Sequence, residues 1–271
     1  MLIAQLSDLH IIPPGTRAYG VVDTNPLVER AFQAVAALQP AVDAVILSGD
    51  LTDGGSDEEY DILSDLIRRH LPMPVYLIPG NHDRREGIKA RLGHLPGVND
   101  DPQFIHYVVD DWPVRLVMLD SIVPKQGHGE LCAARLAFLE QALAVAPDKP
   151  TLVVLHHPPI LTGIAHMDEV NLHTSAAFEA VIRRHPQVDR VLCGHVHRPI
   201  IARFGGTLVQ TSPSVVHQVS LDLRPDGPAT FTMEPPAYLL HRWQPQDGLI
   251  SHQGYVETYA GPYPFDVEAM H

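Results

Sequence analysis

Residues 42–50 have the sequence VDAVILSGD, which begins at Val42 and ends at Asp50. An apolar run of this kind is typical of a strand that is buried on both faces of a parallel sheet. It ends at Gly49 and Asp50, and a glycine at that point permits a sharp turn. Four other apolar runs also end at polar residues: residues 2–7 before Asp8 and His10, residues 75–78 before Asn81 and His82, residues 151–155 before His156, and residues 188–193 before His195 and His197.

Amphipathic segments separate these runs in the first two-thirds of the chain. Helical periodicity predicts helices over residues 25–38, 131–145 and 175–185. Ser56 and Glu59 have the spacing of a capping box, which predicts a helix from there to about His70. Residues 104–109 and 114–120 are expected to pair as strands around a turn. The alternation of strands and helices indicates an α/β fold.

The pattern changes at about residue 200. Short runs with a period of two follow, separated by proline and glycine, which is typical of a β-meander. These runs are residues 200–204, 207–211, 215–221, 230–233, 237–243 and 249–255. We therefore expect a core over residues 1–199 and a β-rich C-terminal part over residues 200–271.

The polar residues at the strand ends are expected to form one site, because the carboxyl ends of strands border the ligand crevice of an open α/β sheet. Carboxylate and imidazole groups suit zinc, iron, manganese or cobalt, and no thiolate is among them. A lone histidine is usually just hydrogen-bonded, and a lone Gly-Asp pair usually marks a turn. Five such motifs in order favour a metal site instead. The predicted ligands are Asp8, His10, Asp50, Asn81, His156, His195 and His197.

Seven ligands suit two metal ions better than one, because a single catalytic ion usually takes three protein ligands and water. In Asp8-x-His10 and His195-x-His197, an extended chain places both side chains on one side. Two divalent ions bring four positive charges, and Asp8 and Asp50 bring two negative ones. The net charge of +2 that remains suits a bridging hydroxide and a singly charged phosphodiester, as in two-metal displacement at phosphorus.

The ordered motifs resemble those of the calcineurin-like metallophosphoesterase superfamily. They are Asp8-x-His10, Gly49-Asp50, Gly80-Asn81-His82-Asp83, His156-His157 and Gly194-His195-x-His197. Further stretches resemble the bacterial glycerophosphodiesterase and class III cyclic-nucleotide phosphodiesterase branch, so that the resemblance covers nearly the whole chain. These are Tyr19-Gly20-x-x-Asp23-x-Asn25, His156-His157-Pro158-Pro159, Val216-His217-Gln218-Val219 and Tyr259-Ala260-Gly261-Pro262.

The resemblance implies a four-layer αββα sandwich of two mixed sheets flanked by helices. We expect the C-terminal part, residues 200–271, to complete the second sheet. It implies that Asp8, His10, Asp50 and His197 hold the first ion, and that Asp50, Asn81, His156 and His195 hold the second. His82 would bind the phosphate and help to protonate the leaving group. Asp50, Asn81 and His82 are therefore the predicted catalytic residues.

Tyr19, Asn25 and His217 border the substrate pocket by the same resemblance. Each has a structural alternative. Tyr19 would pack in a loop, Asn25 would cap a helix, and His217 would be a core histidine within a strand-like run.

Other polar residues near the motifs are expected to have roles other than metal binding. Asp53, Asp83 and His157 are expected to orient ligands rather than to bind metal. Arg84 and Arg85 are expected to be solvated at the start of a helix, and Arg198 is left open between a phosphate contact and a salt bridge. The remaining histidines are expected to lie on the surface or to pack: His106, His128, His166 and His173.

The chain has 271 residues and a formal net charge of −13, which disfavours binding to nucleic acid polymers. The N-terminal sequence does not have the pattern of a signal peptide, and no apolar stretch reaches about 18 residues. The two cysteines do not form a Cys-x-x-Cys pair. We expect a cytoplasmic protein that does not bind membranes.

These features predict a metal-dependent phosphodiesterase for small substrates, either 3′,5′-cyclic nucleotides or glycerophosphodiesters. One alternative is a phosphomonoesterase, which includes a protein phosphatase, on the same fold. Another is a scaffold without catalysis. Aromatic and polar residues mix at 241–243 and 255–262, as they often do at subunit interfaces, so we expect at least a homodimer. A tail that covers its own sheet edge is the alternative.

Overall fold

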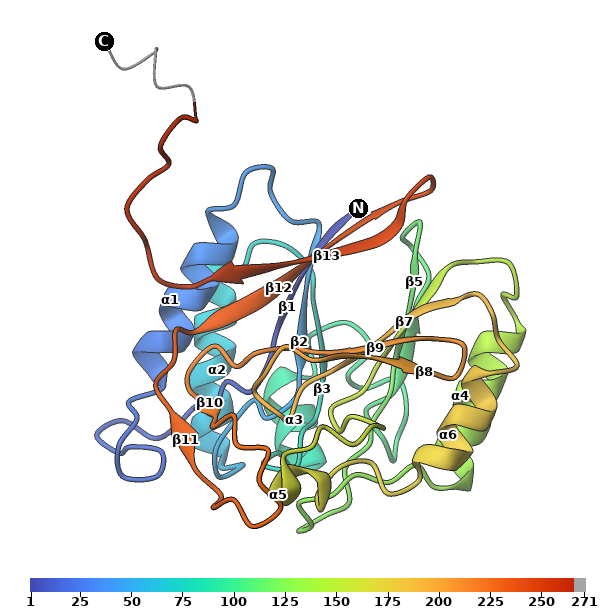
Figure 1. The fold of residues 1–271 in the computed structure, drawn as a ribbon, viewed down its shortest axis with the longest axis horizontal. Coiled ribbons are helices and arrows are strands. Elements are labelled where there is room, and N and C mark those ends of the chain that lie inside the picture. The colour runs from blue at the N-terminus through green and yellow to red at the C-terminus, as the bar shows by residue number, and fades with distance from the viewer. Residues whose placement is uncertain (266–271) are drawn as a thin grey trace.

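Two mixed β-sheets form the centre of the molecule, which the computed structural model describes over residues 1–265 (Figure 1). The first sheet has the order β13-β12-β1-β2-β3, and its strands β1, β2 and β3 are parallel. Its strands are β1 (Leu2–Leu6), β2 (Ala44–Ser48), β3 (Val75–Ile78), β12 (Ala237–Gln244) and β13 (Gly248–Tyr255).

The second sheet has the order β4-β5-β6-β7-β9-β8, with antiparallel strands at its two edges and parallel strands between them. Its strands are β4 (Tyr107–Val109), β5 (Arg115–Met118), β6 (Thr151–Val154), β7 (Val188–Cys193), β8 (Ile201–Phe204) and β9 (Thr207–Thr211). A separate two-stranded ladder joins β10 (Gln218–Val219) to β11 (Phe231–Thr232).

Helices cover the outer face of each sheet (Figure 1). Helices α1 (Asn25–Ala36), α2 (Asp57–His70) and α3 (Arg85–Leu92) pack beside the first sheet, and α4 (Ala133–Ala144) and α6 (Ser175–Ile182) pack beside the second. The short helix α5 (Ala165–Asp168) lies apart from both groups. The predicted four-layer α/β architecture is therefore confirmed.

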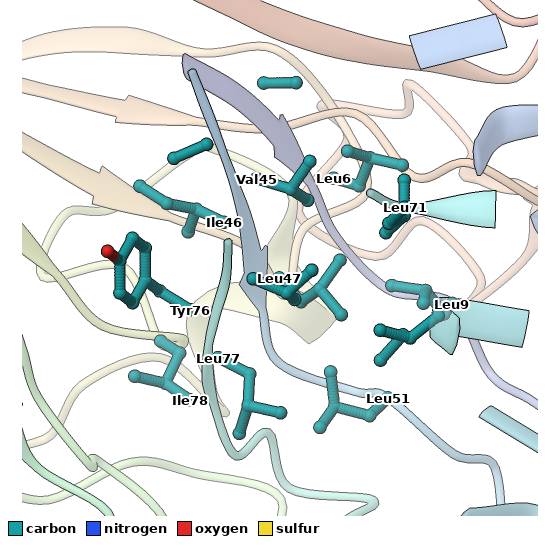
Figure 2. Packing of buried hydrophobic residues seen from close by; sticks show 14 of the residues in the cluster. Leu6, Leu9, Val45, Ile46, Leu47, Leu51, Leu71, Tyr76, Leu77 and Ile78 are labelled. Atoms are coloured by element: carbon teal, nitrogen blue, oxygen red, sulfur yellow. The ribbon is translucent and has the colours of Figure 1, made fainter. Parts of the chain in front are cut away.

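Side-chain alternation explains the layers, because successive residues of a strand point to opposite faces. In β5, Leu116 and Met118 belong to the core cluster between the sheets, whereas Val117 packs with Leu139 of α4 and Phe178 of α6. Figure 2 shows the same alternation in the first sheet, where Ile46 and Leu47 of β2 point to opposite sides. These side chains are fully buried, and each contributes about 1.5–3 kcal/mol of transfer free energy.

The capping box predicted for α2 is present. The Ser56 hydroxyl accepts from the Glu59 amide at 3.3 Å, and the Glu59 carboxylate accepts from the Ser56 amide at 2.7 Å. Three acidic residues in the first turn and three basic residues in the last turn complement the helix dipole. The helix therefore starts and stops where its sequence indicates.

Strands after residue 200 complete the second sheet, as expected, but they also join the first. β8 and β9 extend the second sheet, and β12 pairs with β1 in the first. The run predicted as a strand over residues 215–221 contains only β10, because its first part is drawn to the loop after β1. There the Val215 amide donates to the Ser7 carbonyl at 3.3 Å, and the Ser214 hydroxyl donates to the Asp8 carbonyl at 2.8 Å. Residues 266–271 of the C-terminal part lie outside the described residues.

A buried chain of polar groups crosses the space between the sheets. The side-chain amide nitrogen of Gln5 donates to the Ser48 hydroxyl at 2.9 Å, and the side-chain oxygen Oε1 of Gln5 lies 3.0 Å from His241 Nε2. His241 Nδ1 lies 2.7 Å from the Ser251 hydroxyl, which also lies 3.4 Å from the Arg190 guanidinium. The chain ties β1 and β2 to β12, β13 and β7.

The end of the described chain leaves the body of the molecule after β13 (Figure 1). An ion pair between Arg30 and Glu257, 3.3 Å long, lies near the start of this arm. Tyr259, Tyr263 and Phe265 on the arm are exposed. None of the helices in residues 1–265 combines the length and apolar character needed to span a membrane.

Candidate metal centre

The seven predicted ligands lie together at the carboxyl ends of strands from both sheets. Asp8 and His10 follow β1, Asp50 follows β2 and Asn81 follows β3. His156 follows β6, and His195 and His197 follow β7. Six of the seven are buried, and Asn81 is half-buried. The site therefore sits where the edges of the two sheets meet.

The backbone at most of these positions is left-handed. Asp8, His10, Asp50, His195 and His197 have φ between 46° and 70°, which is uncommon for residues other than glycine. Only two other non-glycine residues in the described chain have positive φ, Tyr19 and Lys125. Such strain persists where the surrounding structure fixes it, and it concentrates at functional sites.

One glycine is required by close approach. Gly49 has φ +96°, and a Cβ there would overlap the imidazole of His156. The turn at Gly49 thus lets the loop after β2 of the first sheet lie against His156, which follows β6 of the second.

Hydrogen bonds at Nδ1 fix the tautomers of His10 and His197. His10 Nδ1 lies 3.0 Å from an Asp53 carboxylate oxygen, and His197 Nδ1 lies 2.9 Å from the His217 carbonyl. Each Nδ1 therefore carries the proton, and each Nε2 presents a lone pair. The two Nε2 atoms lie only 3.2 Å apart, with Asp8 Oδ1 3.4 Å from His197 Nε2. Lone pairs and a carboxylate that converge in this way could hold a metal ion between them.

A second group of donors converges on the other side of Asp50. His156 Nδ1 donates to the Ser48 carbonyl at 2.8 Å, and its Nε2 lies 3.3 Å from Asn81 Oδ1 and 3.4 Å from Asp50 Oδ2. The buried Nε2 of His195 has no hydrogen-bond partner among the described residues. Asp50 Oδ2 also lies 3.8 Å from His10 Nε2, so this carboxylate faces both groups.

The charge states match these contacts. Burial would raise the pKa of Asp8, but His197 and His156 outweigh it and lower that pKa to about 2. Burial lowers the pKa of His195 to about 3, which keeps the imidazole neutral. Burial would also lower the pKa of His156, but Asp50 raises it to about 9, so a proton at Nε2 competes with a metal ion there.

The donors fit divalent metal ions. Separations of 3.2–3.8 Å are those between neighbouring ligands of one ion whose metal–ligand bonds are about 2.0–2.2 Å long. Asp8, His10, Asp50 and His197 can each place one donor atom within 4.8 Å of the others. Nitrogen and oxygen donors without sulfur suit zinc, iron, manganese or cobalt. The cluster is thus able to bind metal ions.

Two carboxylates support the ligand loops, as expected for them. Asp53 holds His10, as described above. Asp83 accepts hydrogen bonds from the amides of Leu51 at 3.0 Å and Gly80 at 2.8 Å, which ties the loop after β2 to the loop after β3. Burial and the Asp50 carboxylate raise the pKa of Asp83 to about 6.

His82 lies at the rim of the cluster. Its amide donates to Asp50 Oδ1 at 3.0 Å, and its Nδ1 donates to the Asp53 carbonyl at 2.7 Å. Burial would lower the pKa of His82, but Asp50 and the Asp53 carbonyl raise it above its ordinary value. Because Nδ1 is bound to a carbonyl, Nε2 is the nitrogen that remains for a reacting group.

A cavity of about 400 Å³ opens over the donors. One wall contains Tyr19, His217 and Phe231, whose rings lie 5.2–5.4 Å from one another. His217 is both buried and at the cavity, and burial lowers its pKa to about 2. Asn25 is not among the lining residues, because its amide is bound to the backbone of Ile12 at 3.0 and 2.8 Å.

A second part of the cavity lining was not predicted. Met167, Val170 and His166 form it, and Val219 of β10 contributes from the side. His166 is half-buried and lines the cavity, which the sequence did not indicate. These residues come from a short helix, a turn and a two-residue strand, which have no periodicity for sequence analysis to detect.

Two arginines near the site are bound to protein groups. Arg85 donates to both carboxylate oxygens of the buried Asp120, at 2.7 and 2.8 Å, so the expectation that it is solvated is wrong. Arg198 donates to the Val219 carbonyl at 2.6 Å and pairs with Glu234 at 3.0 Å. Arg198 thus forms the salt bridge that was one of its two alternatives.

The chain is similar to known phosphoesterases. The model of the calcineurin-like phosphoesterase family matches residues 1–199. A probable glycerophosphodiester phosphodiesterase of Arcobacter nitrofigilis is 38% identical over 266 residues, which cover 98% of this chain and 97% of the relative. A probable cyclic nucleotide phosphodiesterase of Rhodopseudomonas palustris is 37% identical over 260 residues, which cover 93% and 92%. The crystal structure of a dimetal phosphatase from Danio rerio has the same fold, with a TM-score of 0.65 at 16% identity over 94% of this chain and 99% of that one.

Proposed function

Because the chain belongs to the calcineurin-like phosphoesterase family, we propose that it hydrolyses small phosphodiesters with the help of two divalent metal ions. The observation that carries the proposal is the Asp50 carboxylate, which faces two groups of donors on the floor of one cavity. Asp8, His10, Asp50 and His197 would hold one ion. Asp50, Asn81, His156 and His195 would hold the other.

The two ions, when bound, supply the activation of water and the positive charge that stabilises the oxygens on phosphorus. Iron, manganese, zinc and cobalt all suit these ligands. The protein's own residues keep the donors in place. His82 donates a proton from Nε2 to the departing alkoxide, while the Asp53 carbonyl holds its Nδ1–H.

The lining of the cavity favours a diester over a monoester. A phosphomonoester brings two negative charges, and no lysine or arginine is among the described residues that line the cavity. The nearby Arg198 is bound to Val219 and Glu234. A diester brings one charge and two organic groups, which the aromatic wall and the Met167 wall can accommodate.

The relatives narrow the proposed substrates to two classes. One is named a glycerophosphodiester phosphodiesterase and the other a cyclic nucleotide phosphodiesterase. We propose that this chain acts on one or both classes. A panel of cyclic AMP, cyclic GMP and glycerophosphoethanolamine separates them.

The test is hydrolysis of bis-p-nitrophenyl phosphate by protein that has been stripped and reloaded with manganese, iron, zinc or cobalt. We expect turnover with at least one metal and much slower hydrolysis of phenyl phosphate. Faster hydrolysis of the monoester would favour the phosphomonoesterase alternative. Absence of bound metal after metal-replete expression, together with absence of turnover, would favour a scaffold.

We propose that the protein works in a reducing compartment and that its substrate is small. Both cysteines are free, which suits the cytoplasm. The net charge of −13 disfavours nucleic acid polymers as substrates. Cell fractionation, and a hydrolysis assay on single-stranded DNA, test these two points.

We also propose that the chain forms at least a homodimer through its C-terminal part. The support is the arm after β13, whose aromatic side chains Tyr259, Tyr263 and Phe265 contact solvent in the single chain. Light scattering at micromolar concentration tests the proposal. A monomer there, or an unchanged oligomer after deletion of residues 258–271, would contradict it.

A further inference from the structure

His157 is fully buried behind the metal centre, next to two predicted ligands. Its ring lies 4.9 Å from the ring of His156 and 4.7 Å from that of His195. A nitrogen of each of the three rings lies within 4.8 Å of the others, so proximity alone would allow His157 to be a third ligand.

Hydrogen bonds decide against metal binding by His157. Its Nε2 lies 3.2 Å from the Gly127 carbonyl, and its Nδ1 lies 2.8 Å from the Ser121 hydroxyl. A carbonyl only accepts, so Nε2 carries the proton, and Nδ1 accepts from the hydroxyl. Both nitrogens of the neutral ring are in use, and neither has a lone pair for a metal ion.

The loop of residues 122–129 wraps around this ring. Gly129 lies so close that a Cβ there would overlap His157. Backbone bonds hold the base of the loop: the Glu130 amide donates to the Ser121 carbonyl at 2.8 Å, and the Gly129 amide donates to the Asn171 carbonyl at 3.0 Å. The tip, residues 124–127, is exposed and includes Lys125 with φ +65°.

Gly127 connects this tip to the cavity. It lines the cavity on the side of Val170, and its carbonyl is turned to His157. His157 thus lies between Gly127, at the edge of the cavity, and the rings of the predicted ligands His156 and His195.

We propose that His157 is a positioning residue, which holds the 122–129 loop as part of the cavity wall without binding metal. The loop-holding role stands independently, and the effect on substrate affinity rests on the proposed phosphodiesterase function. Release of the loop weakens substrate binding and leaves the ions in place.

Two variants separate the two hydrogen bonds. His157→Gln places an amide nitrogen where Nε2 lies and keeps the bond to Gly127. His157→Asn reaches only the position of Nδ1 and loses that bond. We expect Asn to raise KM for the diester by about 2- to 12-fold, the factor that corresponds to a typical hydrogen bond, with a smaller change in kcat. Gln should restore KM, and both variants should keep the metal content of the wild-type protein.

The position of the loop has a readout that needs no activity. Trypsin cleaves after lysine, and Lys125 lies at the exposed tip. We expect His157→Asn to accelerate cleavage at Lys125 several-fold and His157→Gln to leave it unchanged. Cleavage at Arg17, in a separate exposed loop, should stay the same in both variants.

Two controls separate loop release from a general loss of stability. His106→Gln removes another buried histidine, which stacks on Phe138 at 3.9 Å and does not line the cavity. It should change neither KM nor cleavage at Lys125. In Gly129→Ala, the added methyl group would overlap His157 from the loop side, so this variant should accelerate cleavage at Lys125. It tests the proposal even if His157→Asn does not fold.

Equal cleavage at Lys125 in Asn, Gln and wild-type proteins would overturn the proposal, and so would unchanged cleavage in Gly129→Ala. Loss of one metal ion from His157→Gln would show that His157 is a ligand, which also overturns it. Absence of diester hydrolysis by the wild-type protein would refute the proposed function, while the cleavage experiment would still test the loop.

Discussion

Each imidazole of the first donor group is held from behind, so that its other nitrogen faces the cluster. An Asp53 oxygen holds His10, and the His217 carbonyl holds His197. The Ser48 carbonyl does the same for His156 in the second group. Ring orientation is therefore set by the protein before any ion arrives, which reduces the ordering cost of metal binding.

Asn81 is the one half-buried donor among the seven predicted ligands, and its only neighbour among them at hydrogen-bond distance is His156. Its loss should therefore affect one ion selectively. Asn81→Ala removes the oxygen that lies 3.3 Å from His156 Nε2. We expect the affinity for the second ion to fall by at least the roughly 10- to 100-fold that loss of a ligand-orienting group costs. Metal titration followed by the rate of diester hydrolysis measures this.

The control for this prediction is Asn99→Ala, because Asn99 is exposed and donates to the Gly93 carbonyl away from the cavity. It should leave both the metal titration and the rate unchanged. Unchanged metal binding in Asn81→Ala would remove Asn81 from the ligand assignment.

The sequence predicted the cluster better than the cavity above it. Asp50 and His156 each follow an apolar strand, so their position at one sheet edge follows from the fold. Phe231 and Met167 follow no strand that forms a large sheet, and nothing in their spacing distinguishes them from surface residues. Asn25 was assigned to the pocket by resemblance, but its amide is taken by the backbone of Ile12.

At the scale of elements, Arg198 connects the β10–β11 ladder to the loop that carries His197, because its side chain binds the Val219 carbonyl of β10. The ladder has only two residue pairs and contributes Val219 and Phe231 to the cavity. Arg198→Met removes the bond to the Val219 carbonyl, so we expect KM for a diester to rise about 2- to 12-fold, with a smaller change in kcat. Steady-state kinetics with the substrate panel measures both constants.

Arg224→Met is the matched control, because Arg224 pairs with Asp222 on the exposed turn of the same hairpin. It should leave KM unchanged. A fall in kcat with constant KM in Arg198→Met would instead indicate that Arg198 contacts the phosphate during the reaction.

The polar chain between the sheets should make stability depend on pH. Burial lowers the pKa of His241 from its ordinary value of 6.5 to about 3, so the folded protein keeps this ring neutral. The contribution to stability is present above pH 6.5 and is lost as the pH falls toward 3, because only the unfolded chain takes up the proton. Between pH 6.5 and pH 5 the loss is on the order of 2 kcal/mol.

Urea unfolding of wild-type and His241→Gln proteins at pH 7 and pH 5 isolates this effect. We expect the variant to be less stable at pH 7 and to lose about 2 kcal/mol less on acidification. His252→Gln, an exposed position on β13, should behave as wild type. Identical pH dependence in wild-type and His241→Gln proteins would contradict the assignment.

Among the elements, uniformly apolar strands and capped helices could be predicted from the sequence. β3 forms over the predicted residues, and α2 begins at its capping box. The segment of residues 215–221 was not predictable, because its β-branched residues are typical of a strand, whereas hydrogen bonds to Ser7 and Asp8 hold part of it as a loop. Such long-range bonds have no local signal.

For the whole molecule, metal ions should add to the stability of the fold. The donors belong to both sheets, so an ion that binds them joins the two halves. An ion at about 100 times its dissociation constant adds about 2.7 kcal/mol, which corresponds to a rise of roughly 5–10 °C in Tm for a chain of this size. Differential scanning calorimetry before and after chelation measures the change.

Asp50→Asn is the control for the metal effect. Asparagine tolerates the left-handed backbone of this position but lacks the charge that the two donor groups share. Chelation should barely change the Tm of this variant. A wild-type Tm that is also insensitive to chelation would mean that the ions do not join the sheets.

The pairing of β1 with β12 brings together residues that are far apart in the chain, such as Leu2 and Arg242. At about 5–20 residues per second, a ribosome needs on the order of 10–50 s to progress from one strand to the other. During that interval β1 has β2 on one side and an open edge on the other, which is a template for unwanted pairing with other chains. A shortened gene that encodes only the family-matched residues 1–199 would keep this edge open permanently, and its product should aggregate although it carries all seven donors.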